Sequence, residues 1–200
     1  MDMHTLATAR DRLLETASVL FYARGDRRDR GRYFGRRGGG VQADAVRAFW
    51  VQEGLVATVL KRRHTASVAS LQEWVSSSAL DVRERLLAVF DWLGEFYLTE
   101  GMRRCAFLNA AAESPDPHGP GRRAARRHKR WTRDYLADLA RQIGLECPQR
   151  LGSQLLLLVD GASSRMVVDG DPRVAGVGAA QARQVAALLI DSASVGAGPR

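Results

Sequence analysis

The 200-residue chain has little cysteine, little lysine and no long run of apolar residues. Its two cysteines, Cys105 and Cys147, are too few for a disulfide framework and fit a reducing cytoplasm. No apolar run approaches the roughly 20 residues of a membrane-spanning helix. The first ten residues also lack the apolar segment of a signal peptide. We therefore expect a cytoplasmic protein with no membrane partner.

Lysine is scarce although the chain is basic. All but two (Lys61 and Lys129) of its 30 basic residues are arginine, and against 22 acidic residues they give a formal net charge of +8. This excess favours a polyanionic partner such as nucleic acid, although a solvated basic surface gives the same count. The length fits one large domain or a small one joined to a larger one, and 46% hydrophobic residues is typical of a globular chain.

Motifs of catalysis and metal binding are missing too. The chain has no G-x-S-x-G, no HExxH, no phosphate-binding loop and no Cys–His pairing at a useful spacing. The four histidines share no metal-ligand spacing with one another: His4, His64, His118 and His128. The sequence therefore predicts a protein that is not an enzyme and that has no catalytic residues, cofactor or metal.

What the sequence does contain is helical periodicity. Apolar residues recur three and four positions apart in segments that end near glycine or proline. The predicted helices span 8–23, 53–63, 80–99, 105–112, 122–143, 149–168 and 181–190. The serines at 76–78 predict the N-cap of the helix beginning near 80, and SPDPHGPG at 114–121 predicts a loop. Without strand alternation, the fold class is all-α.

Several segments resemble the TetR family of transcriptional regulators. ARDRLLETASVLFYARG (9–25) is similar to the family's first helix, and EGLVATVLKRR (53–63) to the start of its long fourth helix. Two later segments resemble the ligand-binding and dimerisation domain of one subgroup: RRCAFLNAAAESPDPHGP (103–120) and HKRWTRDYLADLARQIGLECPQRLGSQLLLLVDGA (128–162). The resemblance covers about 170 of the 200 residues.

The resemblance implies a domain plan and a function. Residues 1–52 correspond to a small DNA-binding head of the helix-turn-helix type, 53–193 to a larger helical domain for effector binding and dimerisation, and 194–200 to a tail. It implies a ligand-responsive transcriptional regulator, normally a repressor, that acts as a homodimer. Its partners are a double-stranded DNA operator and a small-molecule effector.

Residues 26–52 depart from this plan, because DRRDRGRYFGRRGGGVQADAVRAFWVQ contains nothing like the family's helix-turn-helix. Back-translation read one nucleotide later permits I-D-A-T-G-V-D-T-L-A-E-x-A-G-V-S-K-R-T-L-Y-A-H-F-G-S-K, which does match and aligns without an insertion. We interpret the segment as part of a DNA-binding head whose coding sequence is frame-shifted. The alternative is a DNA-binding head that has genuinely diverged from the family. The segment carries seven Arg and three Asp, half of the chain's net charge.

The altered segment limits what can be predicted of DNA contacts. Its arginines attract DNA through the phosphates without reading sequence, or form a solvated basic loop. The printed sequence predicts irregular structure over 26–40, and the run 43–63 can fuse into one helix. Candidate DNA-contacting residues are Arg27, Arg28, Arg36, Arg37, Gln42 and Arg47.

In the family, the effector pocket lies among the middle helices. Phe90 and Phe107 are candidates for its lining or for plain core, and Asn109 is a candidate because a buried amide needs partners, unless it anchors a loop. Asp160 lines the pocket or faces a partner subunit. The candidate ligand-binding residues are Phe90, Tyr97, Phe107, Asn109, Trp131 and Ser163.

Two surfaces complete the prediction. The helices at 149–168 and 181–190 are too apolar for a monomer surface, so we expect them to pair with their copies in a four-helix dimer interface. A basic cluster forms either a second nucleic-acid site or a solvated helix face, with Asp134 and Asp138 offsetting its charge: Arg122, Arg123, Arg126, Arg127, Lys129 and Arg130.

Overall fold

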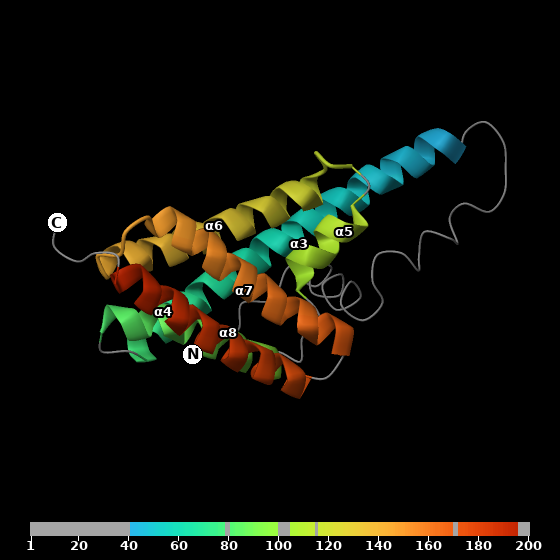
Figure 1. The fold of residues 1–200 in the computed structure, drawn as a ribbon. Coiled ribbons are helices and arrows are strands. Elements are labelled where there is room, and N and C mark those ends of the chain that lie inside the picture. The colour runs from blue at the N-terminus through green and yellow to red at the C-terminus, as the bar shows by residue number, and fades with distance from the viewer. Residues whose placement is uncertain (1–40, 79–80, 100–104, 115, 170–171, 196–200) are drawn as a thin grey trace, which may run out of the picture. The chain divides into compact units, whose positions relative to one another are not determined.

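A computed structural model describes residues 41–78, 81–99, 105–114, 116–169 and 172–195 (Figure 1). These residues contain six α-helices and no strand, which confirms the all-α class. The helices are α3 (Val41–Ser78), α4 (Val82–Thr99), α5 (Ala106–Glu113), α6 (Pro120–Gln142), α7 (Pro148–Asp169) and α8 (Pro172–Val195). The helix predicted at 8–23 and the irregular segment predicted at 26–40 lie outside the described residues.

Helix α3 is much longer than the helix predicted at 53–63. It begins at Val41 and runs unbroken through 43–63, which confirms that this stretch fuses into one helix. It also continues to Ser78, beyond the apolar stripe at 53–63, which agrees with the resemblance of 53–63 to the start of a long helix. The polar and small residues of HTASVAS (64–70) concealed the continuing apolar stripe, whose last members, Leu71 and Val75, are both buried.

The N-cap of α4 is Asp81, and the prediction of a cap at 76–78 is wrong. The Asp81 side chain accepts a hydrogen bond from the backbone N–H of Glu84, with 2.8 Å between Oδ1 and N. This is the usual bond from an N-cap side chain to the third residue of the helix. The serines at 76–78 instead belong to the last turn of α3, where the hydroxyls of Ser76 and Ser77 donate to carbonyls three residues back.

Proline marks the start of α6, α7 and α8, where its missing N–H leaves no hydrogen bond unmade. Helix α8 begins at Pro172, nine residues before its predicted start at 181. The prediction missed these residues because Gly176 and Gly178 interrupt the apolar pattern there. Gly144, with φ of 83°, follows the end of α6, as predicted. Before α7, the exposed Cys147 also has a positive φ, of 53°, whereas Cys105 is buried.

The chain divides into two compact units, one of residues 1–63 and 106–125, the other of 64–105 and 126–200. In the second unit α8 packs against both α4 and α7, as Figure 1 shows for the red and orange helices. Four helices supply its most deeply buried side chains: Leu86, Leu87, Phe90, Leu136, Leu155 and Ile190. Within the residues that the structure describes, every helix is too short or too polar to cross a membrane.

Candidate functional site

Two of the predicted ligand-binding residues meet in the core of the second unit. Tyr97 of α4 donates a hydrogen bond from its hydroxyl to Ser163 Oγ of α7, with 2.7 Å between the oxygens. Ser163 in turn donates to the carbonyl of Val159, also at 2.7 Å. Both side chains are buried, and the fully buried Phe90 lies two turns before Tyr97 on the same face of α4. A hydroxyl pair is thus held within an apolar core.

Asp160, predicted to line the pocket or face a partner subunit, forms an ion pair with Lys129 of α6. Both side chains are largely covered, with 18% of Lys129 and 29% of Asp160 exposed. Because one charge neutralises the other at close range, the pair adds no net charge beside the Tyr97–Ser163 core. It also removes Lys129 from the basic cluster predicted on α6.

The remaining predicted ligand-binding residues lie elsewhere. Phe107 and Asn109 belong to α5 in the first unit, where Phe107 is buried and Asn109 is partly exposed. Trp131 lies on α6 in the second unit and is half-buried. Its indole stacks on Tyr135, with ring centroids 5.1 Å apart, and meets the ring of His64 edge to face at 5.8 Å.

A histidine pair lies beside Trp131, and sequence reasoning missed it. His64 of α3 and His128 of α6 face each other with 3.1 Å between their Nδ1 atoms. Burial, with smaller effects of Lys129 and His64, lowers the pKa of His128 to about 3. Burial and then Arg127 lower the pKa of His64. The pair is separated by 64 residues in the sequence, so no local spacing could have indicated it.

The predicted DNA-contacting residues fall mostly outside the described structure. Arg27, Arg28, Arg36 and Arg37 lie outside the described residues. Gln42 and Arg47 lie in the first turns of α3, where the structure describes the helical backbone only.

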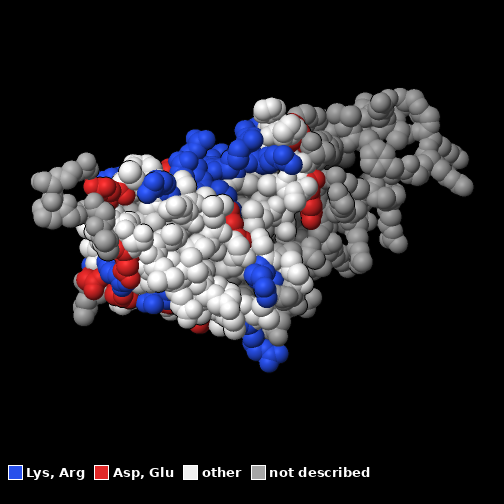
Figure 2. Space-filling view, in the orientation of Figure 1, with Lys and Arg blue, Asp and Glu red and all other residues white. Residues whose placement is uncertain are grey.

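Lys and Arg side chains gather along α6 (Figure 2). Arg123, Arg126, Arg127 and Arg130 are exposed. The partly buried Arg122 instead anchors the preceding loop, because its guanidinium donates to the carbonyls of Ala111 and Ser114. Farther along the helix, Arg133 pairs with Asp134 and Arg141 with Asp138. Acidic residues therefore offset the basic charge in the second half of α6, as the sequence indicated.

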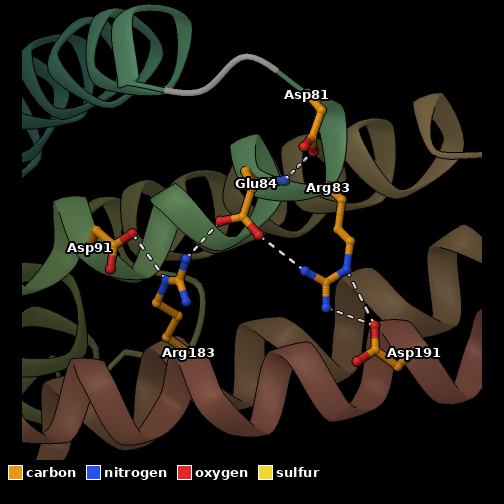
Figure 3. A network of polar contacts seen from close by, with 6 residues as sticks. All are labelled: Asp81, Arg83, Glu84, Asp91, Arg183 and Asp191. Atoms are coloured by element: carbon orange, nitrogen blue, oxygen red, sulfur yellow. Dashed lines mark hydrogen bonds and ion pairs between the residues drawn. The ribbon is translucent and has the colours of Figure 1, made fainter.

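A network of five charged side chains joins α4 to α8 (Figure 3). Arg183 of α8 contacts both Glu84 and Asp91 of α4 at 2.8 and 3.1 Å, and Arg83 of α4 contacts Asp191 of α8 at 2.7 Å. Arg83 also contacts Glu84 at 3.0 Å, and this bond connects the two halves of the network. These groups are partly exposed, so each pair contributes only about 0–1 kcal/mol and is weakened by salt.

An exposed stripe of apolar and small side chains runs along α7 and α8. On α7, Leu157 is 71% exposed and Val168 is 82% exposed. On α8, Val177 is 58% and Leu188 is 69% exposed. Their spacing of 11 residues returns to the same face of a helix. Figure 2 shows a broad uncharged surface over α7 and α8, with isolated basic and acidic patches within it. Clustered exposed apolar residues of this kind mark interaction surfaces.

No protein-family model and no curated protein matches the sequence. Solved structures do match. A TetR-family transcriptional regulator from Streptomyces coelicolor is 26% identical with a TM-score of 0.70, over 90% of this chain and 95% of that one. A TetR-type regulator from Streptomyces avermitilis is 26% identical with a TM-score of 0.67, over 94% and 98%.

A TetR regulator from Legionella pneumophila shares the fold at 17% identity, with a TM-score of 0.64 over 90% of this chain and 98% of that one. The match therefore extends over nearly the whole length of each protein, and it agrees with the segments at 9–25, 53–63, 103–120 and 128–162 that resemble the same family. Over nearly its whole length, the chain is thus similar in fold and sequence to TetR-family transcriptional regulators.

Proposed function

We propose that this chain is a ligand-responsive repressor that binds an operator as a homodimer. The observation that carries the proposal is the full-length similarity to two TetR-type regulators at 26% identity. In such a regulator, an effector binds one conformation better than the other and shifts the population between the DNA-binding and released forms.

The effector site of this proposal lies in the helical core. Its candidate lining is predominantly apolar, with the Tyr97 and Ser163 hydroxyls as its polar groups in the second unit. This composition supports an effector that is mostly apolar and carries a hydrogen-bonding group. A site with buried hydroxyls binds a ligand that can hydrogen-bond to them much better than one that cannot.

The dimer of this proposal forms through α7 and α8. The support is the exposed apolar stripe that contains Leu157, Val168, Val177 and Leu188. Gly161 lies on the same face of α7 and has open space around it, so a second copy can approach the backbone closely there. An isologous interface would bring the stripe of one copy against that of the other.

A second candidate function is a dimeric small-molecule-binding protein that has lost specific DNA binding. It is favoured by the continuity of α3, which runs from Val41 through residue 52 with no break. A helix-turn-helix needs a turn between its helices, and its second helix must be free to enter the major groove. Residues 41–52 continue directly into the long helix α3 and so do not form a separate second helix, which supports this candidate for the printed polypeptide.

An operator-binding assay separates the two functions. Fluorescence anisotropy is measured at physiological salt with DNA from upstream of the chain's own gene, for the printed protein and for a variant with residues 26–52 replaced by the restored segment. Specific binding by the printed protein supports the repressor. Specific binding by the restored variant alone supports the second candidate and the frame shift, whereas steeply salt-dependent binding to any DNA indicates phosphate contacts only.

A further inference from the structure

The separation between the Nδ1 atoms of His64 and His128 fits two ligands of one metal ion as well as it fits a hydrogen bond between the rings. These atoms are 3.1 Å apart, and the rings are nearly perpendicular, at 88°. Two imidazole nitrogens that lie about 2.0–2.1 Å from one ion, at an angle of roughly 90–110°, are about 2.8–3.4 Å from each other. The observed separation falls inside this interval, and the two ligands come from different helices, α3 and α6.

The neutral pair has two possible arrangements. The two rings can share one proton in an N–H···N bond, or they can give both Nδ1 lone pairs to one ion, because imidazole binds metals in its neutral form. In the second case each ring keeps its proton on Nε2.

Two basic residues of α6 lie near the pair. On α6, Arg127 is close enough to affect His64 and Lys129 to affect His128. The Lys129 charge is matched by Asp160 of α7, its ion-pair partner. The aromatic rings of Trp131 and Tyr135 occupy the neighbouring side. The positive charge of Arg127 is expected to weaken the binding of a cation.

We propose that His64 and His128 form a two-imidazole site for a divalent transition-metal ion of the Cu²⁺, Ni²⁺ and Zn²⁺ class. By the general order of metal affinities, Cu²⁺ binds most tightly. No cluster of three or more possible protein ligands occurs in the described part of the chain. Water therefore fills the remaining coordination positions, and the ion exchanges readily. A bound ion joins α3 to α6 next to the Trp131 ring.

The test is a Cu²⁺ titration of the full-length, untagged chain after treatment with EDTA, read by tryptophan fluorescence. Because the Trp131 ring lies 5.8 Å from His64, bound Cu²⁺ quenches its emission. All proteins carry His4→Gln, because an N-terminal amine with a nearby histidine binds Cu²⁺ independently. We expect saturable quenching with one equivalent of Cu²⁺, and only weak quenching in an added Trp131→Phe variant.

Substitution of the ligands tests their roles. His64→Gln and His128→Gln are each expected to weaken Cu²⁺ binding more than about tenfold. His118→Gln is the matched control, because His118 is exposed in the loop before α6, and it should leave binding unchanged. Circular dichroism confirms that each variant folds. Equal binding by the His64 and His118 variants would overturn the proposal.

A second measurement does not depend on the variants folding. Electron paramagnetic resonance of the Cu²⁺-loaded parent protein reports the nitrogen atoms bound to the ion. Two equivalent imidazole nitrogens are expected. A spectrum with one nitrogen, or with oxygen ligands only, contradicts the site and leaves the pair as an imidazole–imidazole hydrogen bond. Neither readout involves DNA, so the result is independent of the operator-binding assay.

Discussion

Gly152 of α7 marks a close approach between the backbones of α7 and α6. A Cβ atom at this position would lie 2.7 Å from the carbonyl oxygen of Arg133 and 2.9 Å from Cβ of Ala137, both on α6. The Arg133 carbonyl belongs to the helix backbone and cannot rotate away as a side chain can. Glycine at 152 is therefore required by the close contact between α6 and α7. It is not required for an unusual backbone conformation, because Gly152 lies inside a regular helix.

We expect Gly152→Ala to destabilise the fold. Alanine is about 1 kcal/mol better than glycine in a helix interior, but overpacking costs about 1–3 kcal/mol. The net loss should be roughly 1 kcal/mol in urea denaturation. Gly54→Ala is the matched control, because Gly54 lies inside α3 with open space around it and should gain stability. Equal or greater stability of Gly152→Ala would show that α6 and α7 are less closely packed.

Acid should destabilise the metal-free protein through His128. The unfolded histidine takes up a proton near pH 6.5, whereas the folded one does so only near pH 3. The unfolded chain therefore binds more protons between these values, so this contribution is complete above about pH 6.5 and is lost as the pH falls toward 3. In EDTA, we expect the unfolding free energy to drop by roughly 1–2 kcal/mol between pH 7 and 5.

The matching measurement compares three proteins. His128→Gln should show a weaker pH dependence of the unfolding free energy than the parent, while His118→Gln should keep the slope of the parent. If all three proteins lose the same stability between pH 7 and 5, other groups control the acid response.

At the scale of single helices, caps and packing determine where each element begins. The sequence predicts the helix at 149–168 almost as observed, since Pro148–Asp169 has a clear apolar pattern. It fails for α3 and α8. The missed parts of these helices are rich in serine, alanine and glycine, so they lack a clear apolar pattern and are helical because of their packing in the fold. The sequence also misplaces the α4 cap, because Asp81 and the serines at 76–78 are equally good capping residues by type.

The corrected cap gives a direct test. Asp81→Ala should cost about 1 kcal/mol of stability, since it removes the hydrogen bond to the Glu84 N–H and a negative charge at the N-terminus of α4. Ser78→Ala should have little effect, because Ser78 is exposed at the end of α3. Thermal unfolding of both variants measures the two losses of stability. A larger loss for Ser78→Ala than for Asp81→Ala would favour the cap at 76–78 that the sequence indicated.

At the scale of the whole molecule, the similarity to TetR-type regulators could be predicted from four segments, but the site could not. The sequence predicts Tyr97 and Ser163 as separate candidates, and their direct hydrogen bond joins α4 to α7 across 66 residues of sequence. The pairs His64–His128 and Lys129–Asp160 join distant segments, so no local pattern encodes them. The predicted DNA contacts stay predictions, as do the dimer and the effector.

The proposed dimer predicts a change in molecular mass. Leu157→Glu combined with Leu188→Glu places charges in the centre of the exposed apolar stripe, so the double variant should be a monomer in sedimentation equilibrium while the parent is a dimer. Leu98→Glu is the control, because Leu98 is 46% exposed on α4, outside the stripe. A double variant with the mass of the parent would place the interface elsewhere.

The contrast between the two cysteines has a practical consequence for spectroscopy. Cys105 is buried and Cys147 is exposed at the corner before α7, so a thiol-specific reagent should modify the folded chain at one position. A nitroxide attached there needs no engineered cysteine. In a symmetric pair of chains it reports a single distance between equivalent corners, and a change in that distance on adding a small molecule would register motion of the two chains in solution.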